Sequence, residues 1–463
     1  MIRVNAMWVA DGARTGWTAS KRQAQIQPVM WRTIAAVWFA TAAAGLVLSQ
    51  SASPPQPDRL TPRQSLSVVL PPGGDRLLSV SIPPSLIAYL EIEQLQGMVS
   101  ASVEGATPAL QFGSDAGVHS VIKIPVQGAP QGVLRLHLHS RDHYLPVRLS
   151  IEMTQPRAAR PEDQEAFAAY AAYAEAEAMR RARQAGGNPS ALQLYEKAIV
   201  LAQKTTDRLL QQQAWIGKSR FFVYDLGDYT QGLACALRAT GLIAGSDLTT
   251  PGAAMAIAAH AWKNLSSTES FLAHYAQGIA AGNRSLALYQ RLGDLYWQGI
   301  LEGNLANAYL EMGDTTHAQA ASQQALAIAQ KLQDFNGIAF TMTTLAGIHA
   351  MRGEYQAAID ANRAAIAALA KAPDADDTGQ IWLNQAEIYG DLGDAEHQRA
   401  AIRTGLALLR QAHDAANTSS GLSSLAILDI RQHRLAQAER HLDESLSLAR
   451  SRQLNRELCM AEL

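Results

Sequence analysis

The sequence has few cysteines and no excess of charge of either sign. Of its 463 residues only two are cysteines, Cys235 and Cys459, and both lie in helical patterns far apart in the chain. Such placement fits two buried apolar side chains better than a disulfide or a metal site. Lysine and arginine number 39 against 41 aspartates and glutamates. This balance argues against nucleic acid as a partner, because binding to a phosphate backbone needs a basic surface.

Catalytic motifs are missing as well. The sequence has no glycine-rich phosphate loop, no G-x-S-x-G turn, no H-E-x-x-H helix and no cysteine beside a suitable histidine. One weak metal-binding candidate is HLHSRDH, in which His137 and His139 would share a strand face and His143 follows. Alternating polar residues on a solvent-facing strand explain the same letters. We therefore predict no catalytic residue, no cofactor and no metal, and a protein that is not an enzyme.

An uncharged apolar run near the N-terminus predicts export. Residues 33–48 carry no charge and follow Arg32 and a second possible start, Met30, but they are shorter than the about twenty residues of a membrane span. We assign residues 30–53 to a signal peptide or signal anchor, and residues 1–29 to an uncertain extension. The basic residues of that extension, Arg3, Arg14, Lys21 and Arg22, would hold it in the cytoplasm.

The bulk of the protein would then be extracytoplasmic, either periplasmic or anchored to the inner membrane through the uncleaved segment. The alternative is that residues 33–48 form a buried apolar helix of a soluble domain. Against this alternative, a Pro-rich linker at residues 54–64 follows the run directly.

Short β-rich runs occupy residues 65–155. They alternate with turn residues at a spacing typical of a β-sandwich. The predicted strands are Leu66–Leu70, Leu77–Ile82, Leu86–Glu93, Met98–Val103, Val118–Ile124, Val133–His139 and Pro146–Glu152. We therefore expect a small β-sandwich domain ahead of the remaining chain.

Residues 160–463 show helical periodicity, beginning with a helix over Glu162–Gln184. A turn position recurs about every 40 residues, just before an alanine-rich helix, and a fixed period of this length is typical of a solenoid of helical hairpins. The turn is a glycine in the clear copies and another residue in two weak ones: Gly186, Gly227, Ala273, Gly313, Gly353, Gly393 and His433. These positions predict about seven hairpins.

The clearest copy resembles a tetratricopeptide repeat. The matching residues are the leucine, small residue and tyrosine of the first helix, the turn glycine and two alanines of the second helix: Leu305, Ala306, Tyr309, Gly313, Ala318 and Ala325. Small side chains let the two helices approach closely, and Tyr309 fills the space between neighbouring repeats. A period of about 40 rather than 34 residues implies longer helices, and HEAT-like repeats share this length. The resemblance implies a mainly α protein that binds peptides or proteins.

A second resemblance concerns the run Leu90–Gly97. It is similar to a strand and turn in the β-sandwich that precedes helical repeats in bacterial proteins of the CHAT (caspase-like) peptidase group. The peptidase domain of that group lies downstream of the repeats, and no catalytic residue can be carried over here. Because the sequence stops at Met460–Leu463 without an evident polar cap, we expect either an absent C-terminal domain or a partner that covers this end.

By the tetratricopeptide resemblance, the first helices of the hairpins line a groove for a partner. The candidate groove residues are Lys218, Tyr224, Lys263, Asn264, Asn304, Asn307, Asn384 and Glu387. Asparagine recurs at one repeat position, and its amide can both donate to and accept from a peptide backbone. The alternative is that these asparagines cap or bridge neighbouring helices.

Three functions remain open at this stage. The first is an exported or membrane-anchored scaffold that binds protein or peptide partners through the solenoid groove. The second is the sensing part of a CHAT-type cysteine peptidase whose catalytic domain is absent from this sequence. The third is a cytoplasmic signalling regulator, which requires the apolar run at residues 33–48 to be structural.

Overall fold

The computed structural model describes residues 59–104, 111–130, 132–142, 145–181, 189–205, 207–372 and 378–451. The predicted export segment, most of the linker, Gly186, His143 and Cys459 lie outside these ranges. Within them, no helix is both long enough and apolar enough to cross a membrane.

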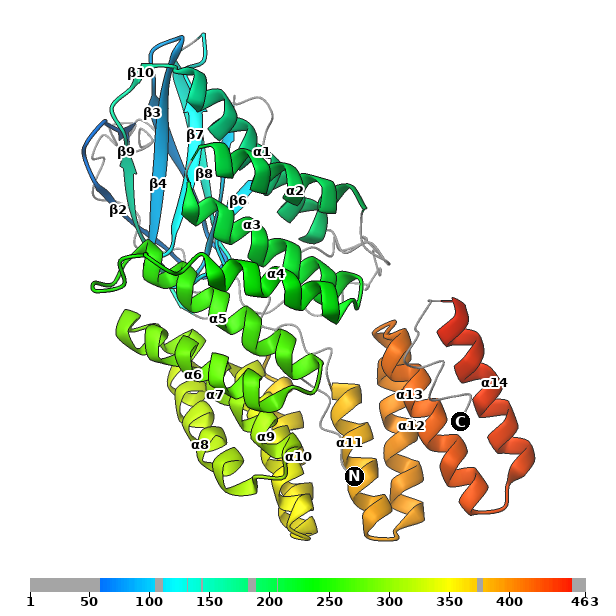
Figure 1. Ribbon diagram of the computed structural model, residues 1–463. Coiled ribbons are helices and arrows are strands. Elements are labelled where there is room, and N and C mark those ends of the chain that lie inside the picture. The colour runs from blue at the N-terminus through cyan, green and yellow to red at the C-terminus, as the bar shows by residue number, and fades with distance from the viewer. Residues whose placement is uncertain are drawn as a thin grey trace, which may run out of the picture.

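Two sheets form the N-terminal part of the fold (Figure 1). One sheet has the strand order β1-β3-β8-β5-β6. The other has the order β10-β4-β9-β2, and β7 also pairs with β4. The strands are β1 (Arg59–Leu60), β2 (Leu66–Leu70), β3 (Asp75–Ser81), β4 (Leu86–Gln96), β5 (Val99–Glu104), β6 (Gln111–Gly113), β7 (Val121–Gln127), β8 (Val133–Ser140), β9 (Val147–Met153) and β10 (Arg157–Ala158).

Alternation of apolar and polar residues explains these strands, because successive side chains point to opposite faces of a sheet. Leu90 and Ile92 of β4, Leu136 of β8 and Ile151 of β9 are at most 1% exposed and share one core between the two sheets. All seven predicted strands overlap observed ones, and the three that the sequence does not reveal, β1, β6 and β10, have only two or three residues each.

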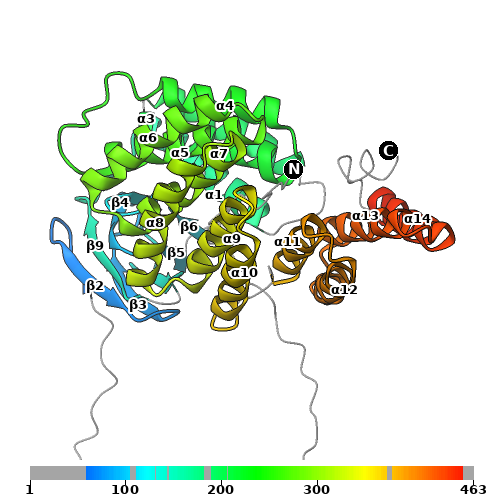
Figure 2. The same ribbon diagram turned by 90° about the horizontal axis from the view of Figure 1, so that it is seen from below.

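Fourteen α-helices follow within the described residues, and consecutive helices pair into seven hairpins (Figures 1 and 2). The helices are α1 (Pro161–Arg181), α2 (Pro189–Lys204), α3 (Arg208–Arg220), α4 (Tyr229–Gly241), α5 (Ala253–Phe271), α6 (Tyr275–Leu292), α7 (Leu295–Glu311), α8 (Thr315–Leu332), α9 (Phe335–Met351), α10 (Tyr355–Leu369), α11 (Thr378–Asp391), α12 (Ala395–Gln411), α13 (Ala415–Arg431) and α14 (Leu435–Ser451). A π-helical turn, η1 (Phe221–Asp225), extends α3. Figure 2 shows the last hairpins, α11 to α14, extending away from the sandwich.

The predicted turn positions lie between the two helices of each hairpin. Every one within the described residues has a positive φ, from 57° at His433 to 80° at Gly313, including the non-glycine Ala273 at 60°. Only glycine adopts this conformation without steric cost, which explains why glycine marks the clear copies. An aspartate often follows: the side chains of Asp228 and Asp314 accept backbone N–H groups in the first turns of α4 and α8.

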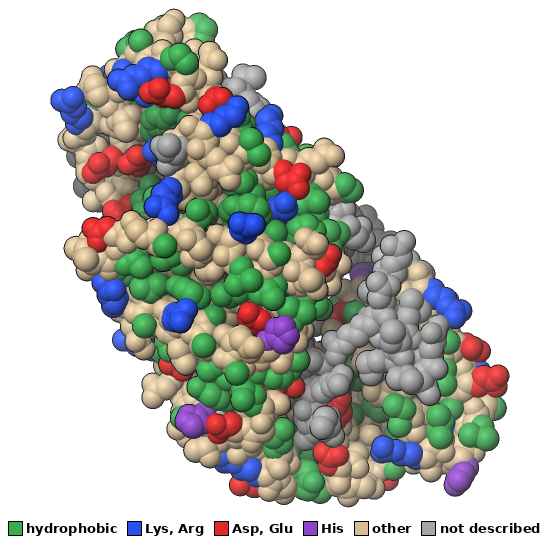
Figure 3. All heavy atoms as spheres, in the orientation of Figure 1, with side chains coloured by type: hydrophobic (Ala, Val, Ile, Leu, Met, Phe, Trp, Pro, Cys, Tyr) green, Lys and Arg blue, Asp and Glu red, His purple; other side chains and the backbone are tan. Residues whose placement is uncertain are grey.

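Close helix packing rests on the small residues that define the repeat. Ala306 of α7 and Ala318 of α8 are fully buried, and Tyr309 stacks on His317 with ring centroids 5.2 Å apart. Cys235 is buried in α4, as predicted, and burial raises the pKa of its thiol to about 11. The visible face of the molecule carries interspersed basic and acidic side chains (Figure 3), in keeping with the balanced composition.

Candidate functional site

A loop of the sandwich, residues 114–120 between β6 and β7, lies against the helical array. Its Ala116 is 1% exposed and belongs to one apolar cluster with Ile216 of α3, Met255 of α5 and Trp297 of α7. These helices are the first helices of three successive hairpins, and α3 contacts α5 as α7 contacts α9. We call α1, α3, α5, α7, α9, α11 and α13 together the first-helix layer. The loop therefore covers the part of this layer formed by α3, α5 and the N-terminal end of α7.

Asp115 anchors the loop through two arginines. Arg141, in the β8–β9 connection, donates to Asp115 Oδ1 at 2.7 Å, and Arg220 of α3 donates to Oδ2 at 2.9 Å. All three side chains are at most 7% exposed. Burial opposes ionisation of Asp115, but the guanidinium groups of Arg141 and its neighbours prevail and hold its pKa well below the usual value. The carboxylate thus joins sandwich and array through a buried ion pair.

Gly117 and Val118 continue the contact at α7. The N–H of Val118 donates to Asp294 Oδ2 at 2.8 Å, while Asp294 Oδ1 accepts the N–H of Trp297 at 3.1 Å and caps α7. Gly117 has a φ of 86°, and a Cβ there would lie 2.2 Å from Asp294 Oδ2. Burial raises the pKa of Asp294. Only glycine therefore fits at position 117.

The run Leu90–Gly97 of the sandwich holds the same loop through side-chain contacts. Gln94 is fully buried; its Nε2 donates to the carbonyl of Ser114 at 3.3 Å and to Ser120 Oγ at 2.5 Å. Glu93 Oε1 lies 2.7 Å from His119 Nδ1. The run Leu90–Gly97 therefore has a structural role that its letters do not reveal: it shapes the loop that docks on the helices.

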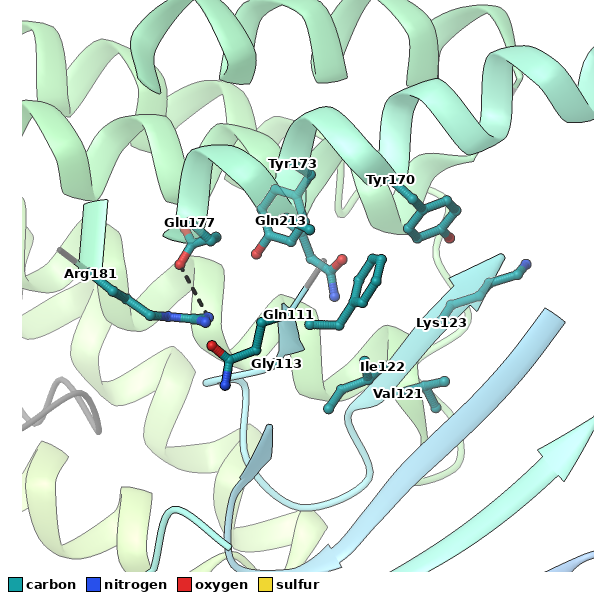
Figure 4. A pocket seen from close by; sticks show the side chains of 12 residues that line it. Gln111, Gly113, Val121, Ile122, Lys123, Tyr170, Tyr173, Glu177, Arg181 and Gln213 are labelled. Atoms are coloured by element: carbon teal, nitrogen blue, oxygen red, sulfur yellow. Dashed lines mark ion pairs between the residues drawn. The ribbon is translucent and has the colours of Figure 1, made fainter. Parts of the chain in front are cut away.

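A second buried ionic group lies next to the loop on α1. Glu177 Oε2 lies 3.2 Å from Arg180 Nη2 and 3.6 Å from Arg181 Nη2, and Tyr195 donates to Glu177 Oε1 at 2.6 Å. Burial opposes ionisation of Glu177, but the two arginines outweigh it and lower its pKa. Figure 4 shows Glu177 and Arg181 among the side chains that line a narrow pocket between α1, α3 and the strands β6 and β7.

Lys263 of α5 lies at the same junction. Its Nζ is 4.1 Å from the centre of the Trp297 ring, and within the described ranges no carboxylate forms an ion pair with it. Burial, reinforced by Arg220, lowers the pKa of Lys263 to about 7. Burial, together with Lys263, also holds the pKa of His260 well below its usual value.

The other predicted groove residues of the first hairpins take part in contacts within the array. Lys218 pairs with Glu196 at 2.9 Å, and Tyr224 packs edge-on against Phe271 with centroids 5.7 Å apart. Asn264 is buried and donates to Ser219 Oγ at 2.8 Å, which bridges α5 to α3. Asn264 therefore bridges neighbouring helices, which is the alternative to peptide binding that the sequence left open for the recurring asparagines.

The predicted residues of the later hairpins have different surroundings. The side-chain oxygens of Asn304 and Asn307, both on α7, are buried and accept no hydrogen bond from the described chain. Asn384 of α11 accepts from Gln380 at 3.0 Å, and Glu387 is exposed. The structure thus separates the eight predicted residues into a group at or near the loop-covered part and a group beyond it.

The histidine candidates form a local cluster on the sandwich. His137 Nε2 and His139 Nδ1 both lie 2.9 Å from Asp75 Oδ1, and all three side chains are at least 36% exposed. In the described part of the chain, no group of three or more such ligands could hold a metal ion. The residues that do organise the junction, Asp115, Arg141 and Arg220, carry no sequence signal, because their spacing matches no motif.

Comparison with known proteins connects this geometry to a family. Residues 298–371, which include most of α7 and all of α8, α9 and α10, match the tetratricopeptide repeat model. No curated protein matches the sequence.

Among solved structures, the apo form of RapI is similar over 61% of this chain and 97% of its own, with 14% identity and a TM-score of 0.50. Aspartyl phosphate phosphatase F from Bacillus subtilis is similar over 62% of this chain and 72% of its own, with 12% identity and a TM-score of 0.49. A tetratricopeptide repeat protein from Parabacteroides merdae ATCC 43184 is similar over 63% of this chain and 99% of its own, with 12% identity and a TM-score of 0.45. The helical part of this chain therefore has the fold of a tetratricopeptide-type α-solenoid, and residues 298–371 match the repeat family itself.

Proposed function

We propose that this protein is a non-catalytic scaffold whose first-helix layer binds a non-helical segment of a partner protein beyond the part covered by its own loop. The observation that carries the proposal is the loop itself. Residues 114–120 lie across α3, α5 and α7, held by a buried carboxylate and by a backbone N–H that donates to Asp294. The layer is therefore suited to a peptide chain as a binding partner.

The part of the layer from α7 to α13 has the chemistry for a second segment. The amide oxygens of Asn304 and Asn307 need hydrogen-bond donors, and a peptide backbone supplies N–H groups at regular spacing. Ile427 and Ile430 of α13 are 49% and 48% exposed and offer apolar contacts further along. Amide recognition of the backbone would make the capture tolerant of the partner's side chains.

The experiment compares peptide binding by matched variants of the full chain. Peptides selected against the wild-type protein are titrated into Asn304→Ala/Asn307→Ala and into Asn283→Ala, a control that alters an exposed asparagine on α6. We expect a loss of at least tenfold in the double variant, since each lost hydrogen bond costs about 1 kcal/mol. Equal affinity in the double variant and the control would show that the segment binds elsewhere.

We infer export from the apolar run at residues 33–48, with the bulk of the chain in the periplasm, free or held at the inner membrane. Protease added outside the inner membrane of intact spheroplasts should digest the array. Protection of the array there would favour the cytoplasmic regulator instead.

The peptidase-sensor alternative rests on the resemblance of Leu90–Gly97 to the CHAT-group sandwich. The mass of the native protein tests it. A species near 49.8 kDa, or lighter by the leader, fits a scaffold that acts alone, and a much heavier one fits a sensor fused to a further domain.

A further inference from the structure

Lys263 is a largely enclosed cation with no counter-anion. Its ammonium lies over the face of Trp297, and none of the carboxylates in the described ranges reaches ion-pair distance. An aromatic ring attracts a cation by about 0.5–2 kcal/mol, which does not replace the hydration lost on burial. Charges enclosed by protein are normally paired, so the position calls for a negative partner.

Four other titratable groups lie near enough to interact with Lys263 electrostatically. They are Arg220 on α3, Arg180 on α1, His260 on its own helix, and Asp115 from the sandwich loop. Asp115 is the one carboxylate among them, and its two oxygens already accept from Arg141 and Arg220. The junction therefore has more positive than negative charge next to Lys263.

The same cluster has a donor without an acceptor. Trp297 Nε1, which can only donate, is buried and without a partner in the described chain. His260 Nε2, which donates in one tautomer and accepts in the other, is also without a partner there. Their side chains are 1% and 4% exposed, and their ring centroids lie 6.1 Å apart. Lys263 itself is partly exposed to solvent.

We propose that Lys263 binds a small oxyanion, a carboxylate or a phosphate, at the junction between the sandwich loop and the array. Such an anion supplies both the negative charge and the acceptor atoms that the cluster lacks. The site lies beside α7 and does not depend on the peptide binding proposed above. It makes the junction, rather than the array alone, a place where the protein senses a small molecule.

Thermal unfolding of the full chain tests the site. Acetate and inorganic phosphate are titrated separately at pH 6.5 and constant ionic strength, with the wild type, Lys263→Met, Lys263→Arg and the control Lys197→Met, which alters an exposed lysine of α2. We expect saturating anion to raise the Tm of the wild type, the control and Lys263→Arg by about 2 °C, and that of Lys263→Met by less than half as much. A response to acetate alone identifies a carboxylate site, and a response to phosphate alone identifies a phosphate site.

Two results would overturn the proposal: no response of the wild type to either anion, or an equal response in Lys263→Met. Because Lys263→Met could perturb the junction, NMR of the labelled lysine side chains in the wild type gives a second test. A bound anion should raise the pKa of Lys263 by about one or more, and an unchanged pKa at saturating acetate and phosphate would refute the site.

Discussion

The buried pair at Asp115 offers the sharpest test of how the sandwich is joined to the array. In Asp115→Asn, the guanidinium groups of Arg141 and Arg220 lose the carboxylate that they share. Their Nη1 atoms lie 2.7 and 2.9 Å from the Asp115 oxygens, and all three side chains are at most 7% exposed. Removing one partner of a buried ion pair leaves uncompensated charge and costs about 3–5 kcal/mol. We expect the variant to lose about 3 kcal/mol, because the asparagine oxygen keeps one hydrogen bond.

The assay is urea unfolding at pH 7, followed by the fluorescence of the eight tryptophans, of which Trp297 lies at the junction. The matched control is Asp360→Asn, which removes an exposed pair with Arg363 at 3.2 Å and should cost at most about 0.5 kcal/mol. A loss below 1 kcal/mol in Asp115→Asn would mean that the loop contributes little to the junction, and it would remove the basis for treating the covered part of the first-helix layer as occupied.

Three further predictions concern single residues. Ala273→Gly relieves a positive φ and should stabilise the protein by about 0.5–1 kcal/mol in urea unfolding, whereas Ala281→Gly, inside α6, should destabilise it. The hydrogen bond from Arg157 lowers the pKa of Asp163 to about 2, so Asp163→Asn should cost about 1–2 kcal/mol at pH 7, and its difference from the wild type should fade as the pH drops from about 4 to 2. The pKa of Lys263 is lowered, so its protonated form is disfavoured in the folded protein. In anion-free buffer at pH 6, Lys263→Met should therefore raise the free energy of unfolding by about 2–4 kcal/mol. This gain in stability should shrink as the pH rises from about 7 to 10.5, because the lysine of the wild type then loses its proton.

Each of these has a clear opposing result. An unchanged or lower stability in Ala273→Gly would show that the turn carries no strain. A pH-independent difference for Asp163→Asn would mean that the carboxylate is not the titrating group. An equal gain for Lys263→Met at pH 6 and pH 10 would point to packing rather than charge.

The repeat architecture could be predicted because it depends on patterns within short stretches of the sequence. The backbone at each turn adopts a positive φ, which favours glycine, so Gly227, Gly313 and Gly353 marked hairpins without reference to any other part of the chain. The strands likewise follow from alternation along a few residues. Predicted strand Val118–Ile124 begins three residues too early, because residues 118–120 belong to the docking loop and leave the sheet.

The junction could not be predicted, because its partners are distant in sequence and unremarkable in type. Asp115 meets Arg220 across 105 residues, and neither stands in a recognisable motif. Nor could the sequence show that Lys263 and Asn264, adjacent on α5, have different surroundings, one over Trp297 and the other bonded to Ser219. Such contacts are set by how the hairpins stack and by where the sandwich rests on them.

Site-specific photo-crosslinking tests the central proposal most directly. A photoreactive amino acid is placed at the partly exposed Asn304, in the first-helix layer beyond the loop, or at Asn283 on the exposed side of α6, and the native cells are irradiated. The account predicts discrete protein adducts from position 304 and none above background from position 283. Adducts of equal yield from both positions, or adducts from position 283 alone, would contradict a partner-binding surface on the first-helix layer.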